Sequence, residues 1–339
     1  MSNPLLKSKK EIYVPAEWSA HKCIWVGFPS HADLWLENLD GAQAEVAAMV
    51  KALSVGDQMN VIVANAEARA AAEILLAGTK NVTIFDADFG DIWIRDTGCI
   101  FTNDGQALRF KNNGWGGKYD LEHDDSIGDK IAEFAKTPVI NFDFILEGGA
   151  VDQDGAGTLL TTRQCVLNEN RNQNWDEQTA TKELCNAFGA SKVIWLNDGM
   201  LNDHTDGHVD NIARFIAPDT IICQRAADDN DPNKQVFEDI ADILRASTNA
   251  NGEPLNIVQI PSPGCMTNED GDIIPASHMN FIIGNKVVVV PTYGTATANA
   301  AVEEIAKLFP HHKVVGLPSH HILSGGGSFH CLTQQQPLV

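Results

Sequence analysis

Short apolar runs of strand length recur along the chain, and segments with the period of an amphipathic helix separate them. The strand-like runs begin near residues 23, 59, 82, 99, 107, 158, 192, 212, 220, 255, 280 and 313. Helical patterns lie between them at about 41–54, 66–77, 124–136, 176–188, 233–247 and 297–309. The chain is therefore predicted to have an α/β fold.

Two stretches predict β-hairpins. In "IARFIAPDTIICQ" (212–224) and "FIIGNKVVVVP" (281–291), only Pro-Asp or Gly-Asn separates two strands. Each hairpin is followed by a helical pattern and a single strand, and residues 99–138 show the same order. Such a unit, recurring at intervals of roughly 60 to 70 residues, indicates several similar ββαβ modules rather than a simple alternating barrel. We expect one domain over residues 1–339, with loops that converge on a common face and a flexible N-terminus at 1–11.

The chain is acidic, with 24 Lys and Arg against 45 Asp and Glu and a formal net charge of -21. This balance argues against nucleic acid or anionic membranes as partners. A cationic substrate would suit it, although many proteins carry such a charge for solubility alone. The apolar runs are far shorter than the ~20 residues of a membrane span. Residues 1–20 also lack the apolar region of a signal peptide, so we expect a cytoplasmic protein.

Seven cysteines are scattered without CxxC pairs, which indicates neither a disulfide framework nor a zinc ribbon. One of them, Cys331, lies in the unusual stretch "SGGGSFHCLTQQQP" (324–337). The three glycines would let the backbone approach a ligand closely, and a cysteine thiolate is a strong nucleophile. A small buried hydrophobe is the alternative for this residue. A phosphate loop is excluded, because "SFHC" follows the glycines where Lys and Ser or Thr are required.

The segment "NDHTDGHVDN" (202–211) gathers histidines and carboxylates and allows three interpretations. His204, His208 and Asp210 could ligate zinc on a helix, but Gly207 and the clustered Asp and Asn disfavour a helix there. On a strand, His208 and Asp210 would point to the same side and could face one ligand. A solvated acidic turn is the third interpretation.

Three further stretches combine turn residues with polar or aromatic side chains: "DIWIRDTG" (91–98), "NNGWGGK" (112–118) and "LEGGA" (146–150). Each alone is more often a plain turn than a site. Together with the two stretches above, they could place carboxylates, a ring, an imidazole and a thiol in one pocket: Asp96, Asp210, Glu147, Trp93, His208 and Cys331. Such a set suits a guanidinium, whose N–H groups bond carboxylates and whose face stacks on aromatic rings.

The motifs occur in one order, from "EIYVPAEWSAHKCIWVGFP" through "DIWIRDTG", "NNGWGGK", "EGGA", "LNENRN" and "TDGHVDNIARF" to "GGGSFHCLTQQQP". This ordered set resembles the agmatine deiminase family of guanidino-group-modifying enzymes, kin of the bacterial peptidyl-arginine deiminases. The resemblance runs from about residue 12 to 337. It implies the pentein fold, a five-bladed α/β propeller of ββαβ modules about a pseudo-fivefold axis. It also implies hydrolytic deimination of a small guanidino compound, first of all agmatine to N-carbamoylputrescine and ammonia, a step of putrescine biosynthesis.

By position in these motifs, the resemblance makes Cys331 the nucleophile, His208 the general acid and base, and Asp96 and Asp210 the carboxylates that hold the guanidinium. It implies a covalent thiouronium that loses ammonia before water, activated by the histidine, releases the ureido product. This mechanism needs no cofactor and no metal. The substrate-binding residues that we expect are Trp93, Trp115, Glu147, His204 and Asp206.

One position departs from the family pattern. His204 stands four residues before His208, where the agmatine enzymes usually have aspartate, as in "DDTDGH". If that aspartate recognises the distal end of the substrate, an imidazole would weaken recognition of a terminal ammonium. Arginine, peptidyl arginine or another guanidino compound therefore stays an alternative to agmatine. A zinc hydrolase that uses His204, His208 and Asp210 and a non-catalytic pentein that only binds ligands also stay open, and the family further suggests a homo-oligomer.

Overall fold

The computed structural model of the protein describes residues 12–339, and the flexible N-terminus expected at 1–11 lies outside the described residues. Within the described range, the chain forms a mixed α/β structure in which sixteen strands make five separate sheets. No helix in this part of the chain is both long and apolar enough to cross a bilayer. The predicted α/β class is confirmed.

Four of the sheets share the ββαβ order that the sequence predicts. Two consecutive strands pair antiparallel, a helix follows, and the next strand pairs parallel to the second. The helix supplies the crossover that a parallel pair requires. The strands are β4 (Ile100–Phe101), β5 (Ala107–Lys111), β6 (Val139–Ile145), β7 (Val151–Gln153), β8 (Thr158–Thr162), β9 (Lys192–Leu196), β10 (Ala213–Ala217), β11 (Thr220–Arg225), β12 (Asn256–Pro261), β13 (Ile282–Ile283), β14 (Val287–Thr292) and β15 (Lys313–Pro318). The crossover helices are α6 (Ile127–Ala135), α8 (Glu177–Phe188), α9 (Lys234–Ala246) and α10 (Ala298–Leu308).

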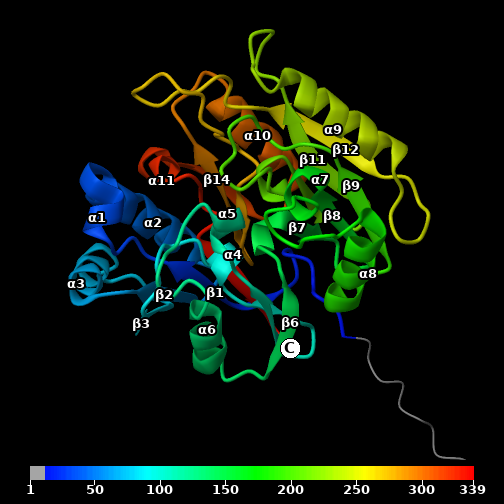
Figure 1. Cartoon of the computed structure of the whole chain (residues 1–339). Coiled ribbons are helices and arrows are strands. Elements are labelled where there is room, and N and C mark those ends of the chain that lie inside the picture. The colour runs from blue at the N-terminus through cyan, green and yellow to red at the C-terminus, as the bar shows by residue number, and fades with distance from the viewer. Residues whose placement is uncertain (1–11) are drawn as a thin grey trace, which may run out of the picture.

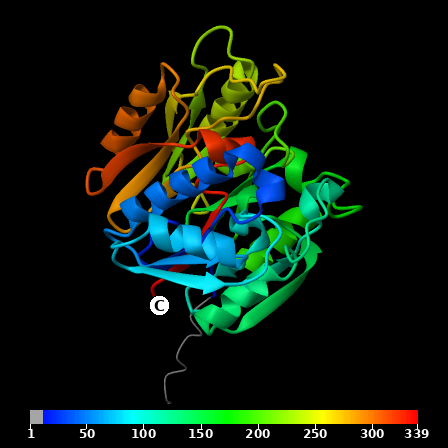
Figure 2. The same ribbon diagram turned by 90° about the vertical axis from the view of Figure 1, so that its left-hand side faces the viewer.

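The fifth sheet joins the two ends of the described chain. β1 (His21–Gly27) pairs antiparallel with β16 (Thr333–Pro337), and β2 (Met59–Val63) and β3 (Val82–Asp86) extend the sheet in parallel. The helices of this unit are α2 (Leu39–Leu53) and α3 (Ala66–Leu75). Figure 1 shows the colours following one another around the molecule, so that the red C-terminal strand returns beside the blue N-terminal segment. Figure 2 shows the blue helices of this unit beside its strands.

Three local elements differ from expectation. The strand expected to enter at residue 208 begins only at Ala213, because Val209–Asn211 form a 3-10 turn. The short strand β7 and the strand β16 have no counterparts among the predicted strands. The sequence of β16, TQQQP, is polar although every residue of it is buried. Short helical turns complete the structure: α1 (Ala32–Trp35), α4 (Ile94–Thr97), α5 (Gly114–Gly117), α7 (Arg163–Val166) and α11 (His320–Ser324).

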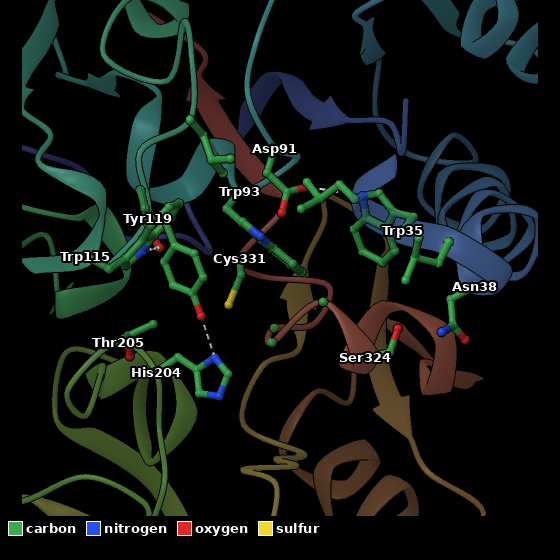
Figure 3. A pocket seen from close by; sticks show the side chains of 17 residues that line it. Trp35, Asn38, Asp91, Trp93, Trp115, Tyr119, His204, Thr205, Ser324 and Cys331 are labelled. Atoms are coloured by element: carbon green, nitrogen blue, oxygen red, sulfur yellow. Dashed lines mark hydrogen bonds between the residues drawn. The ribbon is translucent and has the colours of Figure 1, made fainter. Parts of the chain in front are cut away.

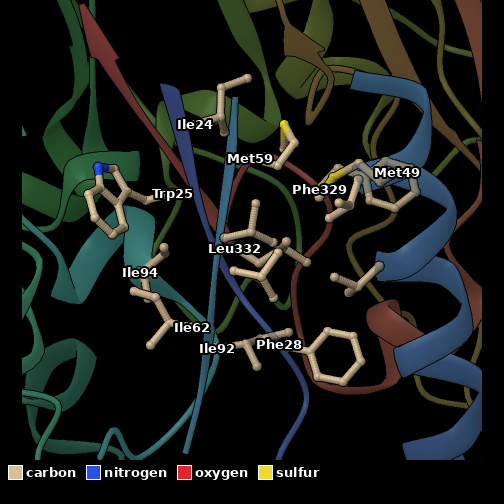
Figure 4. Packing of buried hydrophobic residues seen from close by; sticks show 14 of the residues in the cluster. Ile24, Trp25, Phe28, Met49, Met59, Ile62, Ile92, Ile94, Phe329 and Leu332 are labelled. Carbon is tan, nitrogen blue, oxygen red and sulfur yellow. The ribbon is translucent and has the colours of Figure 1, made fainter. Parts of the chain in front are cut away.

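The largest apolar cluster packs the first sheet against α2 and against the loop before β16. Trp25 of β1, Met49 of α2, Phe329 and Leu332 are almost completely buried in this cluster (Figure 4). Phe329 and Leu332 flank Cys331 in the chain, and both contribute to the same core. Core packing therefore anchors the loop that carries the thiol on both sides.

Replacement of Phe329 by alanine tests this anchoring. The phenyl ring is fully buried, and its removal would leave a cavity that costs about 3–5 kcal/mol in the free energy of unfolding. We expect the Phe329→Ala protein to unfold at a lower urea concentration by that difference. Ile74→Ala is the control, because Ile74 is 76% exposed and surface substitutions stay within about 0.5 kcal/mol. Equal stability of the two variants would contradict the anchoring role of Phe329.

Candidate active site

Three of the four predicted catalytic residues, and Gly149 of the "LEGGA" stretch, share one place in the fold, just before the first strand of a ββαβ unit. Asp96 precedes β4, Gly149 precedes β7, Asp210 precedes β10 and Cys331 precedes β16. The same place before β13 holds Asn280. Hydrogen bonds join the Gly149 loop to Asp96 and Asn280 to Cys331. Repetition of one unit thus brings loops from distant parts of the sequence to one site.

Cys331 lines a cavity of about 310 Å³. Figure 3 shows its sulfur pointing into this space, with Trp93 and Trp115 on its sides and Trp35 farther along the wall. Among the described residues that line the cavity there is no Lys or Arg. Aromatic walls without a cationic side chain suit a flat, positively charged ligand.

The glycines before Cys331 let the backbone lie directly against two tryptophan rings. A β-carbon at Gly325 would come within 2.7 Å of the Trp35 ring, and one at Gly327 would come within 2.6 Å of the Trp93 ring. Side chains at these positions would displace the aromatic walls. The backbone of these glycines approaches the tryptophan rings, and the close approach to a ligand that the sequence suggests stays a prediction.

Asp96 is held by two hydrogen-bond donors. The Gly149 N–H donates to Oδ1 at 2.8 Å, and the Trp115 indole N–H donates to Oδ2 at 2.9 Å. Burial raises the pKa of Asp96, and the positive charge of His208 opposes this rise. Trp115 reaches its position with φ of 53°, a left-handed conformation that is strained for such a residue and persists mainly at functional sites.

His208 and Asp210 are fully buried and lie behind the cavity wall. Both meet Asp96 around Gly149, where a β-carbon would lie 2.6 Å from His208 Nδ1, 2.9 Å from Asp96 Oδ1 and 3.1 Å from Asp210 Oδ2. Only glycine at this position lets the three groups converge. Burial works against a charged His208, but Asp96, with its Oδ2 at 3.7 Å from Nδ1, holds the pKa of the imidazole well above its usual value. His208 is therefore protonated and able to act as an acid at neutral pH.

His330 is bonded to carboxylates rather than to the thiol. Its Nδ1 lies 2.7 Å from Asp210 Oδ2, and its Nε2 lies 2.9 Å from Glu17 Oε2. Burial alone would raise the pKa of Asp210, but the hydrogen bond and charge of His330 hold it below its usual value. Residues 329–332 form a turn, and His330 and Cys331 both approach Asp210.

The Cys331 sulfur faces an amide and a carboxylate. Asn280 Nδ2 donates to Sγ at 3.1 Å, and Asp210 Oδ2 lies 3.7 Å away. Burial, followed by the negative charges of Asp210 and Asp96, raises the pKa of the thiol well above its usual value. The thiol is therefore neutral in the free protein. A cation placed between the two carboxylates would favour the thiolate.

Glu147 and Asp206, both expected to bind substrate, are paired with Arg171 and do not line the cavity. Arg171 Nε donates to both Glu147 oxygens at 3.0 Å, and its Nη1 pairs with Asp206 at 2.6 Å. Glu147 also forms, with Cys165 and His208, the group of possible metal ligands found in residues 12–339, whose atoms lie within 4.8 Å of one another. Because Arg171 already supplies a positive charge to Glu147, this group fits a support behind His208 better than a metal site.

His204 lies at the exposed mouth of the cavity, where its Nδ1 is 2.8 Å from the Tyr119 hydroxyl (Figure 3). The zinc site considered for His204, His208 and Asp210 does not form within the described residues. His204 is exposed, whereas the other two side chains are fully buried, and the possible metal ligands that come together include neither His204 nor Asp210.

Comparisons with known proteins identify the family of this chain. A family model for Porphyromonas-type peptidyl-arginine deiminases matches residues 13–337. The chain belongs to this family. An agmatine deiminase from Stutzerimonas stutzeri is 34% identical over 352 residues, which cover 96% of this chain and 95% of the relative. The solved agmatine deiminase of Enterococcus faecalis has a TM-score of 0.91 at 32% identity and covers 99% of both chains.

A substrate-bound agmatine deiminase of C. jejuni has a TM-score of 0.87 at 30% identity and covers 96% of both chains. These likenesses extend over nearly the full length of the deiminases compared. Membership of the family makes the protein a hydrolase that acts on C–N bonds of guanidino groups.

Sequence reasoning missed three residues of this deiminase site. Trp35 lines the cavity from a segment that carries no recognisable motif, and Tyr119 lines it from the position directly after "NNGWGGK" (112–118). Asn280 is different, because it holds in its unit the place that Asp96 and Asp210 hold in theirs. Alignment of the repeated units at their first strands is the signal that would have found it.

The raised pKa of Cys331 predicts slow alkylation that accelerates with pH. Because only the thiolate reacts, the rate with iodoacetamide should still be rising at a pH of about 8.5, the ordinary pKa of cysteine. Mass spectrometry of the Cys331 peptide separates this thiol from Cys265, an exposed cysteine that serves as the accessible reference. A rate at Cys331 that levels off below neutral pH would contradict a neutral resting thiol.

Proposed function

We propose that this deiminase hydrolyses agmatine to N-carbamoylputrescine and ammonia, with Cys331 as the nucleophile. The observation that carries this proposal is the thiol 3.7 Å from Asp210, in an aromatic cavity whose wall includes Asp96 and no cationic side chain among the described residues. The relatives and solved structures named agmatine deiminase support agmatine as the substrate.

The proposal includes the finer architecture. The four contiguous ββαβ units and the fifth sheet, in which β1 pairs with β16, support a five-bladed pentein propeller that forms a single catalytic domain. In such a propeller the loops before the first strands would share one centre. The chemistry of the site would then be divided among all five units.

Asp96 and Asp210 would hold the guanidinium. Asp210 Oδ1 is buried and has no hydrogen-bond partner among the described residues, so it is an acceptor left for a substrate N–H. Trp93 and Trp115 line the same cavity and provide aromatic faces for the cation. These contacts place the central carbon of the substrate near the Cys331 sulfur.

The chemistry follows from the protonation states of two residues, the neutral thiol of Cys331 and the protonated imidazole of His208. Entry of the cation lets the Cys331 thiol lose its proton to solvent, and the thiolate forms a C–S bond with the guanidinium carbon. Protonated His208 gives its proton to the departing nitrogen, and the C–N bond breaks to release ammonia and leave a thiouronium. Neutral His208 then takes a proton from water, and the hydroxide adds to the same carbon. The C–S bond then breaks, the electron pair returns to sulfur, the hydroxyl proton leaves to solvent, and the ureido product is released.

The charge of the walls favours an amine-ended substrate over free arginine. The carboxylate of arginine would find no Lys or Arg among the described residues that line the cavity, and it would meet Asp91 and Asp96 on the wall. Burial raises the pKa of Asp91 to about 7. A substantial fraction of the Asp91 carboxyl groups is therefore ionised at neutral pH. A terminal ammonium would face these acids with opposite rather than like charge.

A substrate panel tests the proposal. Ammonia and ureido product are measured after incubation with agmatine, arginine, 4-guanidinobutyrate and a peptidyl arginine, and agmatine should react fastest. Cys331→Ala should lower activity by more than about 1,000-fold, because the covalent step is lost. Cys223→Ala is the matched control, since Cys223 is a buried cysteine outside this cavity. Inactivity of the folded protein toward all four compounds would refute deimination, and preference for another compound would replace agmatine as the substrate.

His204→Asp tests recognition at the cavity mouth. A carboxylate there would attract the terminal ammonium of agmatine, and one favourable contact of about 1.4 kcal/mol would lower KM roughly tenfold. The value of kcat should stay within about twofold, because His204 is exposed at the cavity mouth whereas His208 is buried. The inhibition constant of 4-guanidinobutyrate, whose distal end is an anion, should not fall. A parallel fall for both compounds would show that the effect is not charge recognition.

A further inference from the structure

Asn280 contacts the nucleophile from a position that its other bonds determine. Its Oδ1 accepts the backbone N–H of Cys331 at 3.2 Å and that of His330 at 2.9 Å. Because these two groups only donate, they decide which side of the amide carries the oxygen. The NH₂ group is therefore turned toward Cys331 Sγ at 3.1 Å and Asn211 Oδ1 at 3.0 Å.

The second N–H of Asn280 is also committed. Asn211 Oδ1 accepts it, and Asn211 Nδ2 in turn donates to Asp203 Oδ2 at 3.3 Å. Asn280 is completely buried, so no water competes for its amide. With every polar atom of Asn280 bonded, the N–H that faces the sulfur is fixed in place. Two bonds to the amide oxygen also make this N–H a stronger donor.

We propose that Asn280 is a further catalytic residue, whose N–H stabilises the Cys331 thiolate when the sulfur attacks and again when it leaves. This inference rests on the proposed function. The nearest charged groups, Asp210 and Asp96, both disfavour an anionic sulfur. A neutral donor opposite the sulfur offsets this repulsion without a positive charge that would compete with the substrate. Hydrogen bonds to an anion are roughly twice as strong as those between neutral groups.

The step needs no additional reactant. The thiol proton leaves to solvent, the sulfur electron pair forms the C–S bond, and the same pair returns to sulfur when the ureido product departs. Asn280 keeps its own protons throughout. Its hydrogen bond is stronger to the free thiolate than to the carbon-bound sulfur, so it lowers the barrier for departure as well as the cost of forming the nucleophile.

Asn280→Asp separates this catalytic role from a structural one. A purely structural Asn280 would only hold the backbone N–H groups of His330 and Cys331. An aspartate keeps an oxygen for both, and these two donors favour its ionised form. It replaces the N–H opposite the sulfur by an anionic oxygen, and the hydrogen bond to Sγ becomes repulsion.

We expect Asn280→Asp to lower kcat for agmatine by about 100-fold or more with KM within about threefold, as for loss of one donor to a reacting anion. Alkylation of Cys331 by iodoacetamide should shift to higher pH. Asn60→Asp is the matched control, because Asn60 Nδ2 donates to Cys23 Sγ at 3.3 Å in a buried pair outside this cavity. The control should leave kcat and the Cys331 alkylation profile unchanged.

A second variant covers the case in which Asn280→Asp does not fold, as judged by circular dichroism. Asn211→Ala keeps Asn280 and its backbone bonds but removes the acceptor of its second N–H, so the N–H toward the sulfur is held less firmly; it should lower kcat by about tenfold with the same direction of shift in alkylation. Unchanged kcat and alkylation in a folded variant, or a rise in KM alone, would overturn the role of Asn280. Inactivity of the unmodified protein toward all guanidino compounds would refute the proposed function, whereas the alkylation profiles would still decide the role of Asn280.

Discussion

The antiparallel pairing of β16 with β1 is the contact on which the rest of the site depends. It fixes the strand that begins two residues after Cys331, and the Gly27 N–H bonds the Leu332 carbonyl at 3.0 Å. On the other side, the Arg95 N–H donates to the Cys331 carbonyl at 3.0 Å and ties the same turn to the helix that carries Asp96. A thiol near the end of the described chain is therefore held by the beginning of that chain and not left on a free tail.

A buried network of polar and charged side chains holds the Asp210 carboxylate in place. Glu17, just before β1, forms hydrogen bonds with Arg214 and His330, and His330 is also hydrogen-bonded to Asp210. Burial opposes the charge of Glu17, but Arg214 and His330 hold its pKa well below the usual value. Buried charges are tolerable only when each has a partner. Asp210 has such a partner, because its Oδ2 is bonded to His330, and its other oxygen, Oδ1, stays available for a ligand.

Three of the four ββαβ units could be predicted because their apolar periods and hairpin turns are local properties of the sequence, whereas the short strand β7 of the remaining unit was missed. β16 could not, because its glutamines are buried by partners far away in the sequence, such as Arg95, which donates to Gln335 at 2.9 Å. The site residues also divide into those that local sequence patterns reveal and those whose contacts depend on the tertiary structure. The convergence of Asp96 with His208 and Asp210 follows from motifs read together, whereas the pairing of Glu147 with Arg171 depends on tertiary contacts that no local pattern reveals.

The repeated unit also explains why an asparagine suits the loop before β13. Its equivalents are Asp96, Gly149, Asp210 and Cys331, which occupy the same place in their own units. A lysine or arginine at position 280 would neutralise Asp210 and oppose entry of a cation. A carboxylate there would oppose the thiolate, and an apolar side chain would leave the turn N–H groups without an acceptor. A neutral amide meets all three conditions, because it accepts from the turn, donates to the sulfur and leaves the negative charge of the cavity to the substrate.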